Sequence, residues 1–255
     1  MSGVWQRILG GLRTTFVGGL SLFRLAPVIP LIAIVPEFAQ HVAEIRLGMF
    51  ESPEAFAAMG NDPQRWFWAY FKIAGFVVAI LAATRFIGGA GKNWWRIGSI
   101  AWGPFLAALA LNIAYTAVGV IAHRLVPGGL PMALDAIYQV LGLPLMIYLV
   151  GPLIGDRTMT LKRAYTKGWL AVAMAAVLSL LAFGPAQLLH QYNHTLAMGQ
   201  SEMVVWALMV WDSLLVGIIA CWFGAALAAG YWLGLPPGNG VSANDAPSGN
   251  LPEPA

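Results

Sequence analysis

Four polar residues stand inside long apolar runs, where a polar group can take part in chemistry or fix the register of helices. They are Lys72, Asn112, Tyr115 and Asp212. An ionisable side chain inside hydrocarbon is costly, so such residues turn toward the protein interior and pair with one another. We expect Lys72 and Asp212 to pair, with Asn112 nearby. Two interpretations stay open: a path for protons or substrate, and a structural ion pair.

Histidine forms a second group, and all four histidines fall on the same side of the predicted membrane spans. They are His41, His123, His190 and His194. His190 and His194 are four residues apart, so they share one helix face if the helix continues that far. With one or two further ligands, such as Glu202 or Glu37, this pair can bind a divalent metal ion. Solvated histidines at the membrane interface are the competing interpretation, and we assign no metal or cofactor.

The elements that carry these residues are membrane helices. The chain is 59% hydrophobic and 10% charged, whereas a soluble chain is usually about 25% charged. Residues 97–122 contain no charge and exceed the roughly 20 residues that cross a bilayer core. We therefore predict an all-α polytopic bundle with six transmembrane helices. They are residues 22–38, 66–87, 97–122, 136–154, 169–190 and 203–233.

The distribution of charge predicts how this bundle is oriented. Basic residues gather before the first span, between the second and third, and between the fourth and fifth, whereas residues 39–65 form an acidic loop. Short basic loops stay in the cytoplasm. We therefore expect both termini to be cytoplasmic, residues 39–65 to be exported, and the protein to reside in a bacterial inner membrane.

The segments outside the spans have their own patterns. Apolar residues recur every four positions in residues 1–21, which predicts an amphipathic helix whose Arg7 and Arg13 attract anionic lipid headgroups. A helix docked against the bundle is the alternative. The capping sequence Ser52-Pro53-Glu54 predicts a short helix in the exported loop. Residues 235–255 read as a disordered cytoplasmic tail, which leaves residues 1–234 as one transmembrane domain.

Small residues recur every four positions on the last two spans. They are Ala171, Ala175 and Ser179 on one span, and Ala220, Gly224 and Ala228 on the other. This spacing lets helix backbones approach closely in a membrane. We expect the contact to lie within the chain, with dimerisation as the alternative.

The segment PLMIYLVGPLIGDRTMTLKRAYTKGW joins a proline-bearing helix to a turn at Gly155-Asp156, a basic stretch and a Trp-led span. This arrangement resembles the six-helix membrane domain found beside glycerophosphodiester phosphodiesterases, and its stand-alone bacterial relatives of unknown function. The resemblance implies the architecture and a lipid-related role. The chain lacks the phosphodiesterase catalytic domain, so the resemblance carries no catalytic residue.

Soluble catalytic motifs are missing from the sequence, among them a phosphate-binding glycine loop, a zinc-protease helix and paired cysteines. The leading hypothesis is a non-enzymatic protein of the inner membrane with a role in lipid or envelope homeostasis. The alternatives are a small transporter that uses the four intramembrane polar residues Lys72, Asn112, Tyr115 and Asp212, and a membrane-embedded lipid enzyme that uses Asp212 and the histidines. The expected partners are the bilayer and a second copy or another membrane protein, and no nucleic acid.

Overall fold

The computed structural model describes residues 2–126 and 130–235, and within them every regular element is helical. Six helices of this described part are long and apolar enough to cross a membrane. They are α3 (Val28–Arg46), α5 (Pro63–Arg85, extended to Asn93 by short turns), α6 (Trp102–Leu125), α7 (Met132–Leu153), α9 (Trp169–Ala197) and α10 (Glu202–Gly234). The predicted multi-pass helical membrane protein is confirmed.

The first span differs from its prediction at both ends. The helix breaks at Ala26, whose non-helical backbone and the following Pro27 separate α2 (Gly19–Leu25) from α3. At the other end, α3 continues through Pro36 to Arg46. The predicted end near residue 38 is wrong because the polar residues that follow face other helices instead of water. Two more helical turns therefore belong to the bundle, and these turns carry His41 and Glu44 of the site described below.

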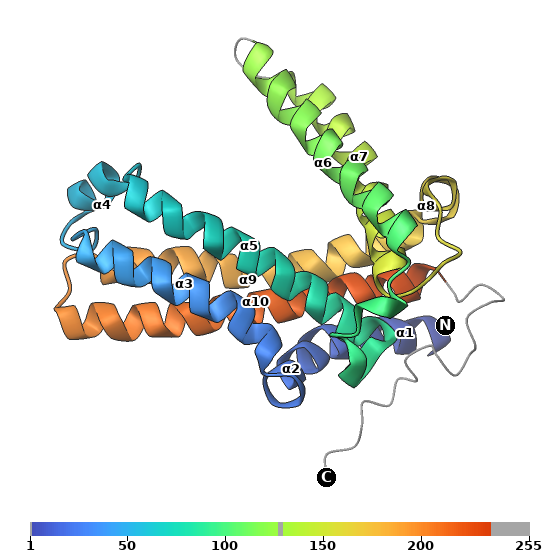
Figure 1. Cartoon of the computed structure of the whole chain (residues 1–255), viewed down its shortest axis with the longest axis horizontal. Coiled ribbons are helices and arrows are strands. Elements are labelled where there is room, and N and C mark those ends of the chain that lie inside the picture. Colours follow the sequence, from blue (N-terminus) through green and yellow to red (C-terminus); the bar gives the residue numbers. More distant parts are fainter. Residues whose placement is uncertain (1, 127–129, 236–255) are drawn as a thin grey trace.

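Four of the spans, α3, α5, α9 and α10, form a bundle in which α10 is the most enclosed helix (Figure 1). Close backbone contact explains this packing. A Cβ atom added at Gly230 or Gly234 would overlap the backbone of Ala175 or Ala171 on α9, and one added at Gly224 would lie 2.6 Å from Ala83 Cβ on α5. The small-residue stripes therefore make contact within the chain.

The remaining two spans, α6 and α7, pair with each other and diverge from the bundle (Figure 1). The rings of Tyr115 and Tyr138 stack between them, with centroids 4.2 Å apart and planes 7° from parallel. At its base the hairpin returns to the bundle, where the carboxylate of Asp156, just after α7, accepts a 2.6 Å hydrogen bond from the Tyr231 hydroxyl on α10. The molecule therefore consists of a compact bundle and a projecting hairpin.

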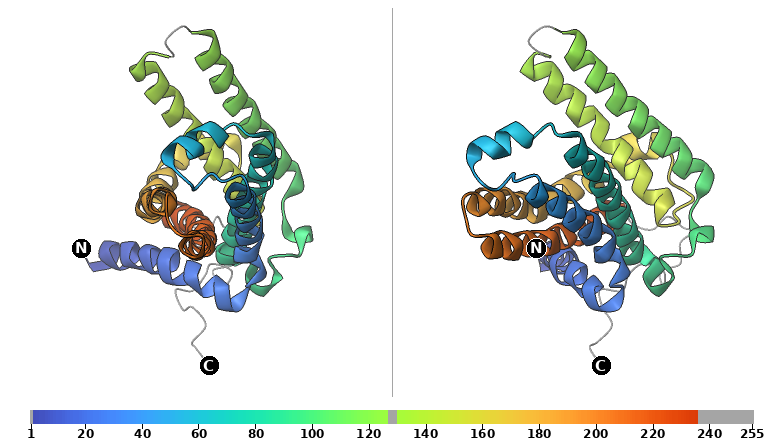
Figure 2. Two further views of the ribbon diagram at one scale, coloured as in Figure 1. Left: turned by 90° about the vertical axis from the view of Figure 1, so that its left-hand side faces the viewer. Right: turned by 60° about the vertical axis from the view of Figure 1, so that its left-hand side comes forward.

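The chain before the first span forms α1 (Ser2–Arg13), a π-helical turn η1 (Thr14–Gly18) and α2. Figure 2 shows α1 lying across one end of the bundle. The Trp222 indole of α10 donates a 3.1 Å hydrogen bond to the Phe16 carbonyl, so this segment docks against the bundle, as in the predicted alternative. Trp5 and Leu9 on α1 remain 63% and 60% exposed, which leaves an apolar surface for lipid.

The shorter connections follow their local sequence signals. The Ser52 hydroxyl accepts a 3.1 Å hydrogen bond from the Ala55 N–H at the start of α4 (Pro53–Met59), so the predicted short helix is confirmed. Asp62 caps α5 in the same way through the N–H of Gln64. A last short helix, α8 (Leu161–Lys167), precedes α9. The predicted disordered tail begins at residue 235, and residues 236–255 lie outside the described part.

Candidate metal centre

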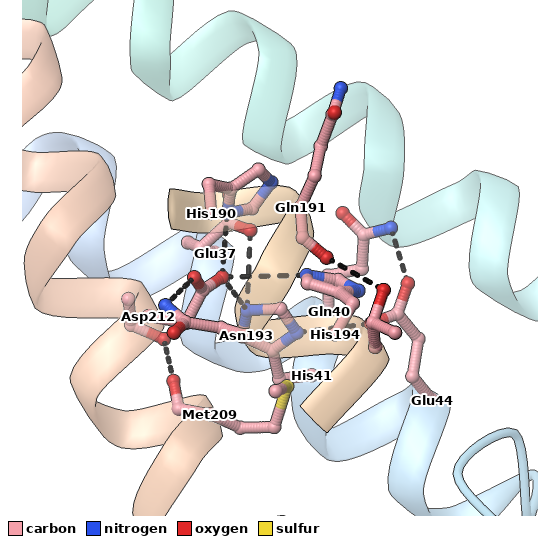
Figure 3. A network of polar contacts seen from close by, with 12 residues as sticks. Glu37, Gln40, His41, Glu44, His190, Gln191, Asn193, His194, Met209 and Asp212 are labelled. Carbon is pink, nitrogen blue, oxygen red and sulfur yellow. Dashed lines mark hydrogen bonds and ion pairs between the residues drawn. The ribbon is translucent and has the colours of Figure 1, made fainter. Parts of the chain in front are cut away.

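Ionisable side chains from four helices meet in the interior of the bundle, near the end that carries α4 (Figures 1 and 3). They are Glu37, His41 and Glu44 of α3, Lys72 of α5, His190 and His194 of α9, and Asp212 of α10. Glu37, His41 and Asp212 are fully buried at 0% exposure, while His190 and His194 each keep 14% of the side chain exposed. We call these seven residues the polar cluster.

Asp212 is the hub of the polar cluster. Its Oδ2 atom lies 2.7 Å from His190 Nδ1, 3.2 Å from His41 Nε2 and 3.4 Å from His194 Nε2. Its other oxygen, Oδ1, accepts a 2.7 Å hydrogen bond from the Asn193 side-chain amide. The carboxylate is therefore held by Asn193 on one side and faces three imidazoles on the other.

The α3 helix contributes three members because of their spacing. Glu37, His41 and Glu44 stand at positions i, i+4 and i+7, so they share one helix face. The two ring nitrogens of His41 then have different neighbours. His41 Nδ1 lies 3.0 Å from Glu44 Oε2, and His41 Nε2 lies 3.3 Å from Glu37 Oε1. Hydrogen bonding at Nδ1 directs Nε2 toward Glu37 and Asp212.

The spacing of these atoms fits the coordination sphere of a metal ion. Zn²⁺ binds nitrogen and oxygen ligands at about 2.0–2.1 Å in a tetrahedron, whose ligand atoms are therefore about 3.3–3.4 Å apart. The distance from Asp212 Oδ2 is 3.2 Å to His41 Nε2 and 3.4 Å to His194 Nε2, and that from His41 Nε2 to Glu37 Oε1 is 3.3 Å. Three of the interatomic distances thus match the edges of such a tetrahedron.

Unpartnered polar atoms point to the same conclusion. Within the described chain, His190 Nδ1, His194 Nε2 and Glu37 Oε2 are buried and lack a partner in hydrogen-bonding geometry, whereas Glu37 Oε1 is paired with Lys72 Nζ. A buried polar atom without a partner costs free energy unless a ligand, an ion or water satisfies it. Two sets of three ligand atoms lie within 4.8 Å of one another, and both include Asp212. The sets are His41, His194 and Asp212, and Glu37, His190 and Asp212.

A second layer of side chains orients the ligand atoms. Glu44, which fixes the His41 ring, itself accepts a 2.9 Å hydrogen bond from Gln40 Nε2 and a 3.0 Å hydrogen bond from Arg65 Nε. Metal-bound histidines usually donate their second ring N–H to a carboxylate, which fixes the tautomer and raises the basicity of the ligand. The arrangement Glu44–His41 has this form.

The predicted ion pair between Lys72 and Asp212 is wrong. Lys72 Nζ lies 2.9 Å from Glu37 Oε1, and Asp212 is surrounded by histidines. Both residues nevertheless belong to the polar cluster, joined through Glu37 and His41. The sequence analysis missed Glu37 as the partner because it placed that residue at the end of a shorter first span, next to a loop in water.

The two other residues predicted to lie near this pair are elsewhere. Asn112 donates hydrogen bonds to the carbonyls of Ala108, at 2.8 Å, and Leu145, at 3.1 Å. The Tyr115 hydroxyl donates to the carbonyl of Tyr138. Both side chains fasten α6 to α7, so their expected place beside Asp212 is wrong. Their helix, α6, packs against α7 and diverges from the bundle that holds Asp212.

The predicted histidine pair lies on one face of α9, since that helix continues to Ala197. Of the two acidic partners considered, Glu37 joins it, whereas Glu202 accepts a 3.3 Å hydrogen bond from the Trp206 indole. His123 lies apart in the hairpin, 3.3 Å from Asp135. The sequence analysis missed His41 as a ligand. The pattern Glu-x-x-x-His-x-x-Glu, directly after an apolar run, is the signal that predicts it.

Aromatic side chains cover the polar cluster on the side of α4. The rings of Phe50 and Phe56 lie 5.9 Å and 6.2 Å from the His194 ring, centroid to centroid. Met49 and Met209, both at 0% exposure, pack in the same apolar group. The polar cluster is therefore covered by an apolar cap on this side, and its residual exposure is at Lys72, which is 25% exposed, and at His190 and His194.

A scan against protein-family models gave no match, and searches of curated proteins and of solved structures gave none either. The resemblance to the phosphodiesterase-associated membrane domain thus stays a prediction.

Proposed function

We propose that this protein is a multi-pass membrane metalloprotein that holds one divalent transition-metal ion in the polar cluster. Three imidazoles and two carboxylates converge there, and imidazole is a ligand that suits zinc, copper, iron and nickel. Tetrahedral spacing and the mixed nitrogen and oxygen donors favour Zn²⁺. His41, His194 and Asp212 are the core ligands, and Glu37 or His190 completes the sphere.

The observation that carries this proposal is the set of buried ligand atoms without hydrogen-bond partners in the described chain. A purely ionic network is the competing explanation, in which protonated histidines pair with the carboxylates. Such imidazolium rings donate from both nitrogens. The nitrogens of His190 and His194 that approach Asp212 are misaligned for donation, although they lie within 3.4 Å of it. A metal ion shared with Asp212 would satisfy these nitrogens without an N–H donor.

Burial favours a role in which the metal is held without catalysis. Catalytic metal sites keep an open coordination position for water or substrate, whereas structural sites are closed by protein ligands. Five candidate ligands and an apolar cap surround the centre, and three of the ligands are at 0% exposure. This supports a non-enzymatic membrane protein that uses the ion to lock α3, α9 and α10 together.

The charge distribution supports a bacterial inner-membrane location with both ends of the described chain in the cytoplasm. The connection between α7 and α9 carries Arg157, Lys162, Arg163 and Lys167, whereas the opposite connection between α3 and α5 carries acidic residues. Basic loops remain on the cytoplasmic side. In this orientation the metal centre lies in the periplasmic half of the membrane, where His190 and His194 face the side from which an ion would enter.

The metal content of the purified full-length protein tests the proposal. Inductively coupled plasma mass spectrometry should find about one zinc ion per chain after zinc addition and removal of excess. X-ray absorption should show a nitrogen and oxygen shell at about 2.0–2.1 Å. Stripping with a chelator should lower the melting temperature by about 5–10 °C, since a ligand at about 100 times its Kd contributes about 2.7 kcal/mol and 1 kcal/mol shifts a chain of this size by about 2–4 °C.

Matched variants make the result specific. Asp212→Asn and His194→Ala should each abolish stoichiometric zinc binding, whereas His123→Ala, a histidine beside a carboxylate in the hairpin, should leave it unchanged. A folded wild-type protein that takes up no transition metal would overturn the proposal. So would loss of binding in the His123 variant to the same degree as in the Asp212 variant.

A further inference from the structure

We infer that α1 and the end of α10 form the two sides of an open binding site for the headgroup of an anionic phospholipid. A cavity of about 560 Å³ lies between these helices and the turn that follows α5. This volume is within the range of sites that hold small molecules, about 300–1,000 Å³. Arg7 and Arg13 line it from α1, and Ile87 and Trp232 line it from the bundle.

The charge of the cavity selects an anion. None of its described lining residues is acidic, and in the described chain neither Arg7 nor Arg13 takes part in an ion pair. Arg7 Nη2 donates a 2.9 Å hydrogen bond to the Leu233 carbonyl, which anchors α1 at the end of α10. A guanidinium has five N–H donors, so Arg7 keeps donors for a phosphate, which arginine binds in a bidentate way.

The apolar part of the lining selects a lipid over a free phosphate ion. Leu9, Ala228, Ala229 and Leu233 face the same cavity as the two arginines. The Trp232 ring is fixed there because its indole N–H donates a 3.1 Å hydrogen bond to the Gly88 carbonyl. Apolar surface beside a pair of guanidinium groups matches a molecule with a charged head and a hydrocarbon body.

A glycine keeps the cavity open. No heavy atom of the described chain lies within 4 Å of a Cβ atom built at Gly10, although Gly10 faces the cavity. The neighbouring Gly11 is different, since an added Cβ there would lie 2.6 Å from Leu233 Cδ1. Gly11 thus lets α1 approach α10, and Gly10 leaves room for a ligand.

The location also fits a lipid of the cytoplasmic leaflet. Figure 2 shows α1 crossing the end of the bundle, as a helix lying in a membrane interface would. Leu233 follows Asp212 by 21 residues of the same helix, which is about 30 Å at 1.5 Å per residue. The lipid site and the metal centre are therefore at opposite ends of α10, and neither proposal depends on the other.

Native mass spectrometry of the full-length protein tests the inference, with phosphatidylglycerol, phosphatidylethanolamine and inorganic phosphate as separate probes. We expect bound phosphatidylglycerol and no adduct with the other two. Each arginine near an anionic headgroup contributes about a factor of five to binding, so Arg7→Ala with Arg13→Ala should weaken phosphatidylglycerol binding about 30-fold. Arg24→Ala, which removes an exposed arginine of α2 outside the cavity, is the matched control and should change binding less than twofold.

Gly10→Leu separates a cavity from general attraction to a charged surface. It keeps every charge, favours helix formation, and should lower phosphatidylglycerol binding at least tenfold by filling the cavity. Unchanged binding in Gly10→Leu would overturn the site. An equal loss in Arg24→Ala, or equal binding of phosphatidylethanolamine, would show non-specific attraction, and competition by inorganic phosphate alone would show an anion site without lipid.

Discussion

The helix bundle and the α6–α7 hairpin are almost equally apolar in sequence but differ in what they bury. The most apolar windows of α6 and α10 have mean hydropathies of 2.0 and 2.2, yet 17% of the first and 56% of the second is buried. The bundle encloses charged side chains from four helices, whereas the described interior of the hairpin is joined through neutral groups such as Asn112, Tyr115 and Tyr138. Hydropathy thus indicates residence in the membrane and leaves open where polar groups meet.

Packing residues explain the difference between the two regions. In the bundle, Gly224 and Gly230 of α10 meet small residues on α5 and α9, so that helix backbones touch. In the hairpin, Gly119 and Gly142 each face a tyrosine ring. Close contact between helix backbones holds the four helices of the bundle together, whereas the tyrosine stack joins only α6 and α7. A cluster that needs ligands from several helices can therefore form only in the bundle.

The largest difference should come from removing the central carboxylate of the bundle. Asp212→Ala removes the buried carboxylate that three histidines face, and breaking a buried charged network costs about 3–5 kcal/mol. Asn112→Ala in the hairpin removes one neutral interhelical hydrogen bond, to the Leu145 carbonyl, and should cost about 1 kcal/mol. Thermal unfolding in detergent, followed by circular dichroism, measures both. Equal losses would mean that the two regions hold together by the same kind of interaction.

The second-largest difference in stability between the two regions should come from filling a glycine position with a large side chain. Gly230→Leu places a large side chain against the backbone of Ala175, and overpacking of this kind costs about 1–3 kcal/mol or more. Gly103→Leu at the start of the hairpin is the matched control, because no heavy atom of the described chain lies within 4 Å of an added Cβ there. Its melting temperature should equal or exceed that of the wild type. A tolerated Gly230 variant would contradict the close approach of α9 and α10.

Much of the fold follows from the sequence because its causes are local. The spans follow from apolar length, and the cap at Ser52 from one hydroxyl at the right place. The end of the first span does not follow, since His41 and Glu44 resemble residues of a loop in water unless their partners on α10 and α5 are known. The site could therefore be predicted in part. Asp212, Lys72, His190 and His194 stand out as polar residues in or beside apolar runs, but their pairing depends on which helices pack together.

The stability of the contact between the hairpin and the bundle, made by Asp156 and Tyr231, should depend on pH in the acid range. Asp156, outside the spans, is buried, which favours its neutral form. Hydrogen bonds from Thr158 and Tyr231 and the charge of Arg163 outweigh burial and hold the pKa of Asp156 below the usual range. A carboxyl whose pKa is lower in the folded state adds stability above its ordinary pKa, near 3.8, and this stability is lost as the pH falls through the folded value.

We therefore expect the wild-type melting temperature to fall below about pH 4, and Asp156→Asn to lose part of this acid dependence. At neutral pH the variant should cost about 1–2 kcal/mol, because hydrogen bonds to a charged acceptor are lost. Thr166→Ala on α8 removes a hydroxyl that bonds only within its own helix in the described chain and serves as the control. If the melting temperature of Asp156→Asn depends on pH in the same way as that of the wild type, the contact between the hairpin and the bundle does not depend on the carboxylate.

The smallest effect should come from the tyrosine pair. In Tyr115→Phe the stacked ring remains and one interhelical hydrogen bond to the Tyr138 carbonyl is lost, which in a membrane costs about 0.6 kcal/mol. So small a change should leave the global melting temperature within about 2 °C. Its effect should instead be local, because the hairpin makes few contacts with the bundle. Hydrogen–deuterium exchange should speed up in α6 and α7 and stay unchanged in α9 and α10. If protection falls in the bundle as well, the hairpin and the bundle unfold as one cooperative unit, and their difference is one of composition and not of stability.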